Sequence, residues 1–445
     1  MLRPLLFATV ILAAGFAAAC GGRDGDETPS PTPTSSQPSP EATRTAATGT
    51  AAARPTPTPR PASPTALPAT ATLAAPSPVA VPGAPEELSQ YAAAIAQYLT
   101  ATNAPVACPD ALLDAWAIPI SPAARCALAD TDADGQDELV LVLTGPGPSE
   151  ESPLDWPVTV AVLHRSAGSW GVAFEPPQTA EGGGFLVSVP SGNLDDVLIA
   201  VRDVNNVPGT EVVYGVESCG AHTCYTTVEV YGWTGTAYAD LTDGEISISY
   251  ADLALEDTDV DGDLEIIMHG GSIGSVGAGP TRTRTEIYAW DGRQYVLTQT
   301  ILDPSDVLYH HVLDAEDAFS AGDLVLALDL YTRALEDQTL LQWKEHERVE
   351  MDPYLHFRIA VTHMALGDLG AEAASSLDAA IDSSPGSLHG EMARAFRDVW
   401  LPAGDTSAGC RAADAYVQAN LDAFDEFWYF GYGNPGFDPQ RLCPL

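Results

Sequence analysis

The sequence predicts a multidomain β + α protein, in which blade-like antiparallel β repeats are followed by an all-α domain. Two changes of pattern along the 445 residues predict this fold class. Residues 126–302 are short apolar runs separated by Gly, Pro and Asp, which is typical of strands joined by tight turns. Residues 303–445 place apolar side chains three and four positions apart, as amphipathic helices do.

Residues 1–20 have the composition of an export signal. Arg3 supplies a positive charge, Leu5 to Phe16 is an apolar core, and Ala17-Ala18-Ala19 is a small-residue cleavage site. Cys20 follows at once, and this arrangement resembles the lipobox of bacterial lipoproteins, whose Cys is lipidated after cleavage. That family usually has Leu where this chain has Ala17, and ordinary signal-peptidase cleavage at the same place is the alternative.

The next segment, residues 21–84, predicts a disordered tether. It is rich in Pro, Thr, Ser and Ala and has no aromatic residue, so it cannot bury a core. A lipidated Cys20 before such a tether predicts a protein anchored at the extracellular face of the cell envelope, in contact with the membrane through its lipid. No later segment is apolar over the length that spans a bilayer.

The net charge of the chain is −42, from 61 acidic and 19 basic residues. This balance excludes nucleic acid as a partner, because few basic groups are present to neutralise phosphates. It is compatible with solubility outside the cell and with binding of cations.

Seven cysteines are present, and six remain when Cys20 is set aside. An exported protein is expected to form disulfides, although six cysteines allow 15 connectivities. The expected pairs are neighbours in the sequence: Cys108 with Cys126, Cys219 with Cys224, and Cys410 with Cys443. The alternative for the middle pair is a zinc site formed by Cys219, His222 and Cys224.

Residues 85–125 predict a helical cap before the strands. Its helix is expected over 85–116, with Pro85 at the first helical position. Four large side chains then fall on one face at three- and four-residue spacing: Leu88, Tyr91, Ile95 and Tyr98.

One acidic pattern occurs twice in the β region. Residues 130–138 read Asp-Thr-Asp-Ala-Asp-Gly-Gln-Asp-Glu, and residues 257–265 read Asp-Thr-Asp-Val-Asp-Gly-Asp-Leu-Glu. Alternating carboxylates before a Gly predict a tight turn around a hard cation, usually Ca²⁺. An EF-hand would need Glu at position twelve, where this chain has Leu141 and Met268, so the EF-hand is excluded.

These loops belong to a unit of about sixty residues that occurs three times and predicts blade-like modules. The unit runs strand, acidic loop, strand beginning with Glu, long loop, strand, and a turn with Gly and an aromatic residue. In the middle copy, residues 203–211, Val207 replaces the third carboxylate, so we expect a weak or empty site.

The unit resembles the FG-GAP/VCBS-type repeats of integrin-like β-propellers, in which D-x-D-x-D-G-x-x-[DE] binds Ca²⁺ between the first two strands of a blade. The resemblance implies a partial or small propeller-like arrangement, since three blades are fewer than the usual four. An open sheet capped by helices and a compact three-blade barrel are the alternatives. The resemblance implies two structural Ca²⁺ sites, with the ligands Asp130, Asp132, Asp134, the Gln136 carbonyl and Glu138, and Asp257, Asp259, Asp261, the Asp263 carbonyl and Glu265.

Residues 303–445 contain two segments with Ala, a large residue and Ala at matched spacing. They are Ala327, Tyr331, Ala334 and Ala373, Leu377, Ala380, each preceded by a Gly-Asp turn. This looks like the tetratricopeptide repeat, which implies a concave face that binds peptides or proteins. A third helix pair is expected at 389–400 and 409–427. A generic small helical bundle is the alternative.

No residue pattern predicts a catalytic triad or an HExxH metal site. The leading hypothesis is a non-catalytic, calcium-stabilised binding or scaffolding lipoprotein with a protein, peptide or glycan partner. One alternative is an extracellular hydrolase of polysaccharide or peptide that uses a carboxylate pair. The other is a purely structural protein of the envelope.

Overall fold

The computed structural model describes residues 79–145, 155–177, 185–188, 194–436, 438 and 442–443. The predicted signal peptide, Cys20 and residues 21–78 of the predicted tether lie outside the described residues. Residues 79–84 are coil, and the Pro82 carbonyl accepts a hydrogen bond of 2.9 Å from the Trp116 indole. Among the helices that the structure describes, none has the length and apolarity needed to cross a membrane.

The N-terminal helical segment is broken rather than continuous. Its elements are η1 (Leu88–Gln90), α1 (Tyr91–Ala101) and α2 (Asp110–Ala115). The expected helix over 85–116 is therefore wrong in its start and in its continuity: Asn103 has a φ of 47°, and two prolines interrupt the chain before α2. Of the predicted apolar face, Leu88, Tyr91 and Ile95 are buried, and Tyr98 is half-buried.

The first sheet packs against α1. Leu139 to Leu143 in its second strand are fully buried, in a core to which α1, α2 and residues of the second sheet also contribute. The sheet is antiparallel, in the order β1-β2-β3-β4, with β5 paired to β3. Its strands are β1 (Cys126–Ala129), β2 (Glu138–Thr144), β3 (Asp155–Ser166), β4 (Ser169–Phe174) and β5 (Phe185–Ser188).

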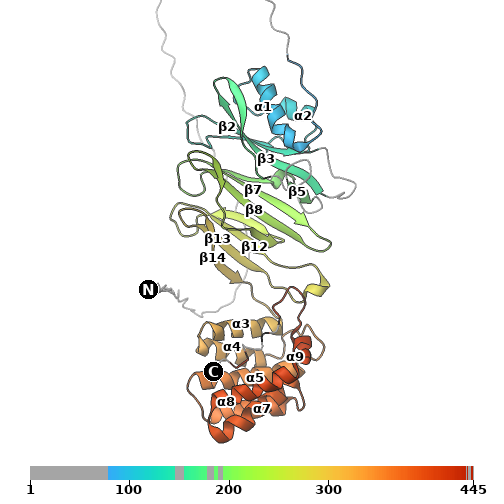
Figure 1. The fold of residues 1–445 in the computed structure, drawn as a ribbon, viewed down its shortest axis with the longest axis vertical. Helices are drawn as coiled ribbons and strands as arrows, with labels where there is room; N and C mark the ends of the chain where they lie inside the picture. Colours follow the sequence, from blue (N-terminus) through green and yellow to red (C-terminus); the bar gives the residue numbers. More distant parts are fainter. Residues whose placement is uncertain are drawn as a thin grey trace, which may run out of the picture. The chain divides into compact units, whose positions relative to one another are not determined.

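Two further antiparallel sheets follow along the chain (Figure 1). The second sheet follows η2 (Leu194–Asp196) and is formed by β6 (Leu198–Arg202), β7 (Glu211–Cys219), β8 (Cys224–Trp233), β9 (Tyr238–Asp240) and β10 (Ile246–Ser249). Its strand order is β10-β8-β7-β6, and β9 pairs with β8. The third is formed in sequence order by β11 (Asp252–Glu256), β12 (Glu265–Gly270), β13 (Arg284–Trp290) and β14 (Tyr295–Leu302), with η3 (Val276–Ala278) before β13. The described strands do not close into a barrel or a propeller.

The C-terminal region is helical, so the coarse prediction of β sheets followed by helices is confirmed. The helices are α3 (Leu308–Ser320), α4 (Leu324–Glu336), α5 (Arg348–Ala365), α6 (Ala371–Ser383), α7 (Leu388–Ala403), α8 (Thr406–Ala419) and α9 (Leu421–Trp428). All six residues of the two Ala-large-Ala segments are buried in their common core. The single helix expected over 409–427 is wrong: α8 ends at Ala419, and the carbonyl of Asn420 begins α9 by accepting from the Ala423 and Phe424 amides.

Three disulfides join the cysteines expected from local pairing. They are Cys108–Cys126, Cys219–Cys224 and Cys410–Cys443. The first links the segment before α2 to β1, and the second lies at the ends of β7 and β8. The third joins α8 to the C-terminal tail, whose Leu442 carbonyl accepts a hydrogen bond of 2.9 Å from the buried Arg358.

Candidate metal sites in the acidic loops

The first acidic loop connects two paired strands. Ala129 at the end of β1 lies opposite Glu138 at the start of β2, so residues 130–137 form the connection. The backbone reverses tightly there, because Ala133 and Gly135 have φ values of 61° and 85°. Such a turn directs successive carboxylates inward, which is the arrangement that calcium loops use.

Three carboxylates converge in this loop. Asp130, Asp132 and Glu138 each place one carboxylate oxygen within 4.8 Å of the others. Two oxygens bound to one Ca²⁺ at about 2.4 Å are separated by at most about 4.8 Å, so this group is compatible with a shared ion. Its oxygens also accept backbone hydrogen bonds, since Asp130 accepts from Asp134 and Gly135, both at 3.0 Å.

The Glu138 carboxylate is held at the base of the loop. It is 3 % exposed, and its Oε2 accepts from the Thr131 amide at 2.8 Å and from the Thr131 hydroxyl at 3.0 Å. Burial raises the pKa of Glu138, Thr131 opposes this rise, and the charges of Asp132 and Asp134 add to it. A cation would relieve the repulsion between these carboxylates.

Asp134 and Gln136 interact with each other. Both are exposed, and Asp134 accepts from the Gln136 amide at 2.8 Å and from its side-chain Nε2 at 3.0 Å. The structure therefore gathers Asp130, Asp132 and Glu138 and places Asp134 against Gln136. The expected ligation by Asp134 and by the Gln136 carbonyl stays a prediction.

The third sheet carries its acidic loop in the same place. Glu256 at the end of β11 pairs with Glu265 at the start of β12, and Val260 and Gly262 have φ values of 66° and 102°. Asp257, Asp259 and Glu265 form one group of ligand oxygens within 4.8 Å of one another. A second group, also within 4.8 Å, shares Glu265 and is completed by Asp261 and Asp263.

Asp261 and Asp263 interact directly. Their side chains are hydrogen-bonded, and Asp261 also accepts from the Asp263 amide at 3.1 Å. Burial raises the pKa of Asp263 to about 7, with further contributions from the hydrogen bond and the charge of Asp261. The hydrogen bond from Asp263 lowers the pKa of Asp261. Two negative charges at this separation repel each other, and a bound cation would relieve the repulsion.

Glu265 occupies the place that Glu138 has in the first loop. It is 2 % exposed, and its Oε2 accepts from the amide and the hydroxyl of Thr258, both at 2.6 Å. Its Oε1 is buried and has no hydrogen-bond partner among the described residues. The anchoring threonines were missed in the sequence, although the shared Asp-Thr-Asp start of both loops was the signal for them.

The middle loop differs in its backbone and in its hydrogen bonds. Pro208 stands where the other loops have Gly135 and Gly262, and proline cannot adopt their positive φ. The Asn205 side-chain oxygen accepts from the Val207 amide at 2.9 Å, and Oε2 of the buried Glu211 accepts from the Val204 amide at 3.0 Å. The middle loop therefore lacks the third carboxylate and the glycine of the other two loops, and the weak or empty site stays a prediction.

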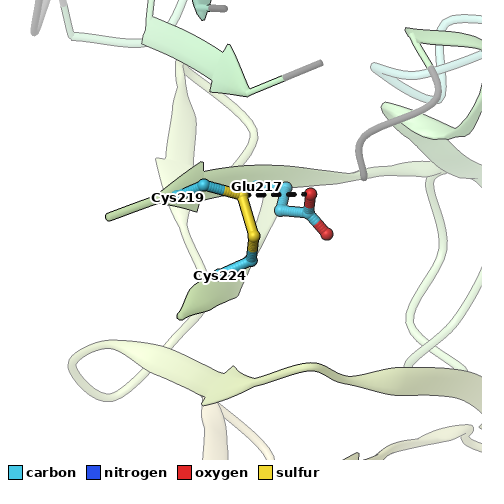
Figure 2. A group of neighbouring side chains, drawn as sticks. All are labelled: Glu217, Cys219 and Cys224. Carbon is cyan, nitrogen blue, oxygen red and sulfur yellow. Dashed lines mark hydrogen bonds between the residues drawn. A yellow bond between two sulfur atoms is a disulfide. The ribbon is translucent and has the colours of Figure 1, made fainter. Parts of the chain in front are cut away.

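The zinc alternative at the middle cysteine pair is wrong. Cys219 and Cys224 form a disulfide, so neither sulfur is present as the thiolate that zinc binds. Figure 2 shows Glu217 beside the pair, with its Oε1 at 3.6 Å from the Cys219 sulfur. The disulfide joins the end of β7 to the start of β8 and so closes this hairpin.

Comparison of the chain with protein-family models, curated proteins and solved structures found no match.

Proposed function

We propose that this chain is an exported, lipid-anchored protein of the cell envelope, in which Ca²⁺ stabilises the β region and the protein acts as a non-catalytic binding or scaffolding module. One observation carries the calcium part of the proposal: two loops with the same carboxylate spacing each gather ligand oxygens within 4.8 Å. The export and the lipid anchor rest on the sequence of residues 1–20. Closely spaced carboxylates repel one another and raise the free energy of the folded loop when no cation is bound.

The chemistry of the donors selects the cation. Each loop offers oxygen ligands, and hard cations prefer oxygen over nitrogen or sulfur. Ca²⁺ takes six to eight oxygens in flexible geometry, which suits an exposed loop that also supplies water-accessible positions. The ligands proposed from the resemblance to FG-GAP/VCBS-type repeats are Asp130, Asp132, Asp134 and Glu138 with the Gln136 carbonyl, and Asp257, Asp259, Asp261 and Glu265 with the Asp263 carbonyl.

The helical region is the proposed place for a protein or peptide partner, with a glycan as the further class. Its tetratricopeptide-like character is supported by the buried Ala-large-Ala segments of α4 and α6. Large apolar side chains remain at its surface, including Val325 at 71 % and Tyr432 at 62 % exposure. Exposed apolar groups of this size are typical of interaction surfaces when they gather into a patch.

Calorimetric titration tests the calcium proposal. The full chain with Cys20→Ser, which cannot be lipidated, is titrated with CaCl₂, and two sites are expected. Asp132→Ala removes the first-loop site and Glu265→Gln weakens the third-loop site, because each variant deletes a grouped carboxylate from a separate loop. Absence of Ca²⁺ binding, or binding that both variants leave unchanged, overturns the proposal.

The lipid anchor is tested separately by cell fractionation. Wild-type protein is expected in the membrane fraction, and Cys20→Ser is expected in the soluble fraction, because single-site lipidation supplies the attachment. A Cys20→Ser protein that fractionates with membranes as wild type does would remove the lipoprotein assignment and leave the calcium proposal intact.

A further inference from the structure

Position seven, counted from the first Asp of each loop, distinguishes the third loop from the first. The first loop has Gln136 at this position, and its exposed side chain donates to Asp134 at 3.0 Å. The third loop has Asp263, which is 9 % exposed and belongs to a group with Asp261 and Glu265. Of the loops that the structure describes, the third is the one that forms two overlapping groups of ligand oxygens.

The unpaired oxygen of Glu265, a residue that belongs to both groups, is a second, separate observation in the third loop. Oε2 is satisfied by Thr258, whereas Oε1 is buried without a hydrogen-bond partner among the described residues. Such an atom costs free energy in the folded protein unless a ligand contacts it. Glu138, Glu211 and Glu265 occupy the same position in the three described loops. Of these, Glu265 is the one with a buried carboxylate oxygen that has no hydrogen-bond partner among the described residues.

We propose that the third loop binds Ca²⁺ on its inner side, through the carboxylates of Asp261, Asp263 and Glu265. This inference rests on the proposed calcium function and changes the ligands of one site: the side chain of Asp263 replaces its carbonyl, and Asp257 and Asp259 are not required. Three carboxylates supply up to six oxygens, and water completes the coordination. Two of its three carboxylates, those of Asp263 and Glu265, are buried, whereas Asp257 and Asp259 are exposed, and a cation is attracted more strongly by buried charges.

The inner position links two sheets. Leu264, between Asp263 and Glu265, donates its amide to the Val204 carbonyl at 2.8 Å, and the Tyr295 hydroxyl donates to the same carbonyl at 2.8 Å. Val204 lies in the middle loop, between β6 and β7. An ion that holds Asp263 and Glu265 therefore fixes Leu264, the residue between them that donates to Val204. Ca²⁺ binding in the third loop is thus expected to stabilise the middle loop as well.

Titration of matched variants tests the ligand assignment. The full chain with Cys20→Ser and Asp132→Asn, which lacks the first-loop site, is expected to keep one Ca²⁺ site. Adding Asp263→Asn weakens this site by about tenfold or more, whereas adding Asp259→Asn changes the dissociation constant less than about threefold. Both changes remove one charge and preserve side-chain size, and Asp261→Asn repeats the test if Asp263→Asn is unfolded by circular dichroism.

The outcomes separate the inference from the proposed function. If Asp259→Asn weakens the site as much as Asp263→Asn or more, the inner assignment is overturned and the calcium proposal stands. If the parent chain binds no Ca²⁺, both are overturned.

Hydrogen exchange tests the link between the sheets. In the Cys20→Ser chain, Ca²⁺ is expected to slow amide exchange in residues 257–268 and also in residues 203–212. The same slowing of both segments is expected when Asp259→Asn is added. With Asp263→Asn added, both segments are expected to need about ten times more Ca²⁺, or still more, for the same slowing. Protection of 257–268 alone in the Cys20→Ser chain would contradict the link.

Discussion

Val260 has the least favourable backbone conformation of the third loop. Its φ is 66°, which β-branched residues rarely adopt, and its side chain is 86 % exposed, so packing contributes little in return. Asn tolerates this conformation. Val260→Asn is therefore expected to raise the free energy of unfolding by about 1 kcal/mol, measured by urea denaturation in EGTA.

Val276 provides the matched control for this substitution. It is 93 % exposed, and its φ is not positive. Val276→Asn is expected to change the free energy of unfolding by less than about 0.5 kcal/mol, as surface substitutions usually do. If the two variants have equal stability, the backbone strain assigned to Val260 is wrong.

His389 is a buried, neutral histidine in the helical core. The Trp428 indole N–H donates to its Nε2 at 3.2 Å, so its Nδ1 carries the proton and donates to Glu350 at 3.0 Å. Burial lowers the pKa of His389, and Glu350 partly opposes this. The unfolded chain binds a proton near pH 6.5 that the folded protein excludes, so the free energy of unfolding falls as pH falls below about 6.5.

His389→Gln is expected to reduce this pH dependence. Between pH 7 and 5.5 the variant should lose less stability than wild type, and the difference is at most about 1.4 kcal/mol per pH unit. Urea denaturation at several pH values gives the slopes. His346→Gln is the control, since the His346 side chain is 79 % exposed and its removal should leave the slope as in wild type. Parallel slopes for all three proteins would show that His389 is not the titrating group.

At the level of elements, the disulfides cross-link segments of different length. Cys410–Cys443 spans 33 residues and ties the tail to α8, whereas Cys219–Cys224 spans 5 residues and closes one hairpin. Loop-closure entropy predicts that removing the long cross-link costs roughly 4 kcal/mol and removing the short one roughly 2 kcal/mol. Double Cys→Ser variants of each pair, compared by urea denaturation, test this order. Equal losses would show that unfolded-chain entropy does not set the difference.

The strands and turns followed from local sequence, and several side-chain placements did not. The hairpins at Gly168 and Gly292 were predictable because each glycine stands between two apolar runs. Both glycines adopt positive φ in the structure. Sequence spacing indicated the carboxylates of both acidic loops. It did not show that Asp263 turns its side chain toward Asp261, because the resemblance assigned that position to a backbone oxygen.

Tertiary contacts also overrode local pattern in the helical region. Glu347 lies in the charged run 344–350, which is typical of a solvated helix face. It is 1 % exposed instead, and its Oε2 accepts from the amides of Trp343 and Lys344 at 2.8 and 3.1 Å. The run spans the turn before α5 and the first residues of that helix, and the Glu347 carboxylate closes this turn by accepting from the amides of two residues that precede the helix. Such a role depends on where the helix begins, which spacing fixes only to within a few residues.

For the whole molecule, a net charge of −42 opposes compaction. Added salt relieves this repulsion nonspecifically, because the Debye length falls from about 30 Å at 0.01 M to about 8 Å at 0.15 M ionic strength. The proposed binding of Ca²⁺ would act differently, since it would neutralise carboxylates at positions that are fixed in the folded state. The two effects have different dependence on concentration and can therefore be separated.

Thermal unfolding of the full chain with Cys20→Ser makes this separation. At 5 mM CaCl₂, each site with a dissociation constant of about 10⁻⁴ to 10⁻³ M is expected to add about 1–2 kcal/mol to the free energy of unfolding. This increase comes on top of the increase that NaCl produces at equal ionic strength. Asp132→Asn is expected to remove the part of this excess that belongs to the first loop and to leave the NaCl response nearly unchanged, because it deletes one charge of many. Equal midpoints in CaCl₂ and NaCl would mean that the acidic loops respond to ionic strength alone, and the carboxylates grouped around Glu138 and Glu265 would then need another cation or another role.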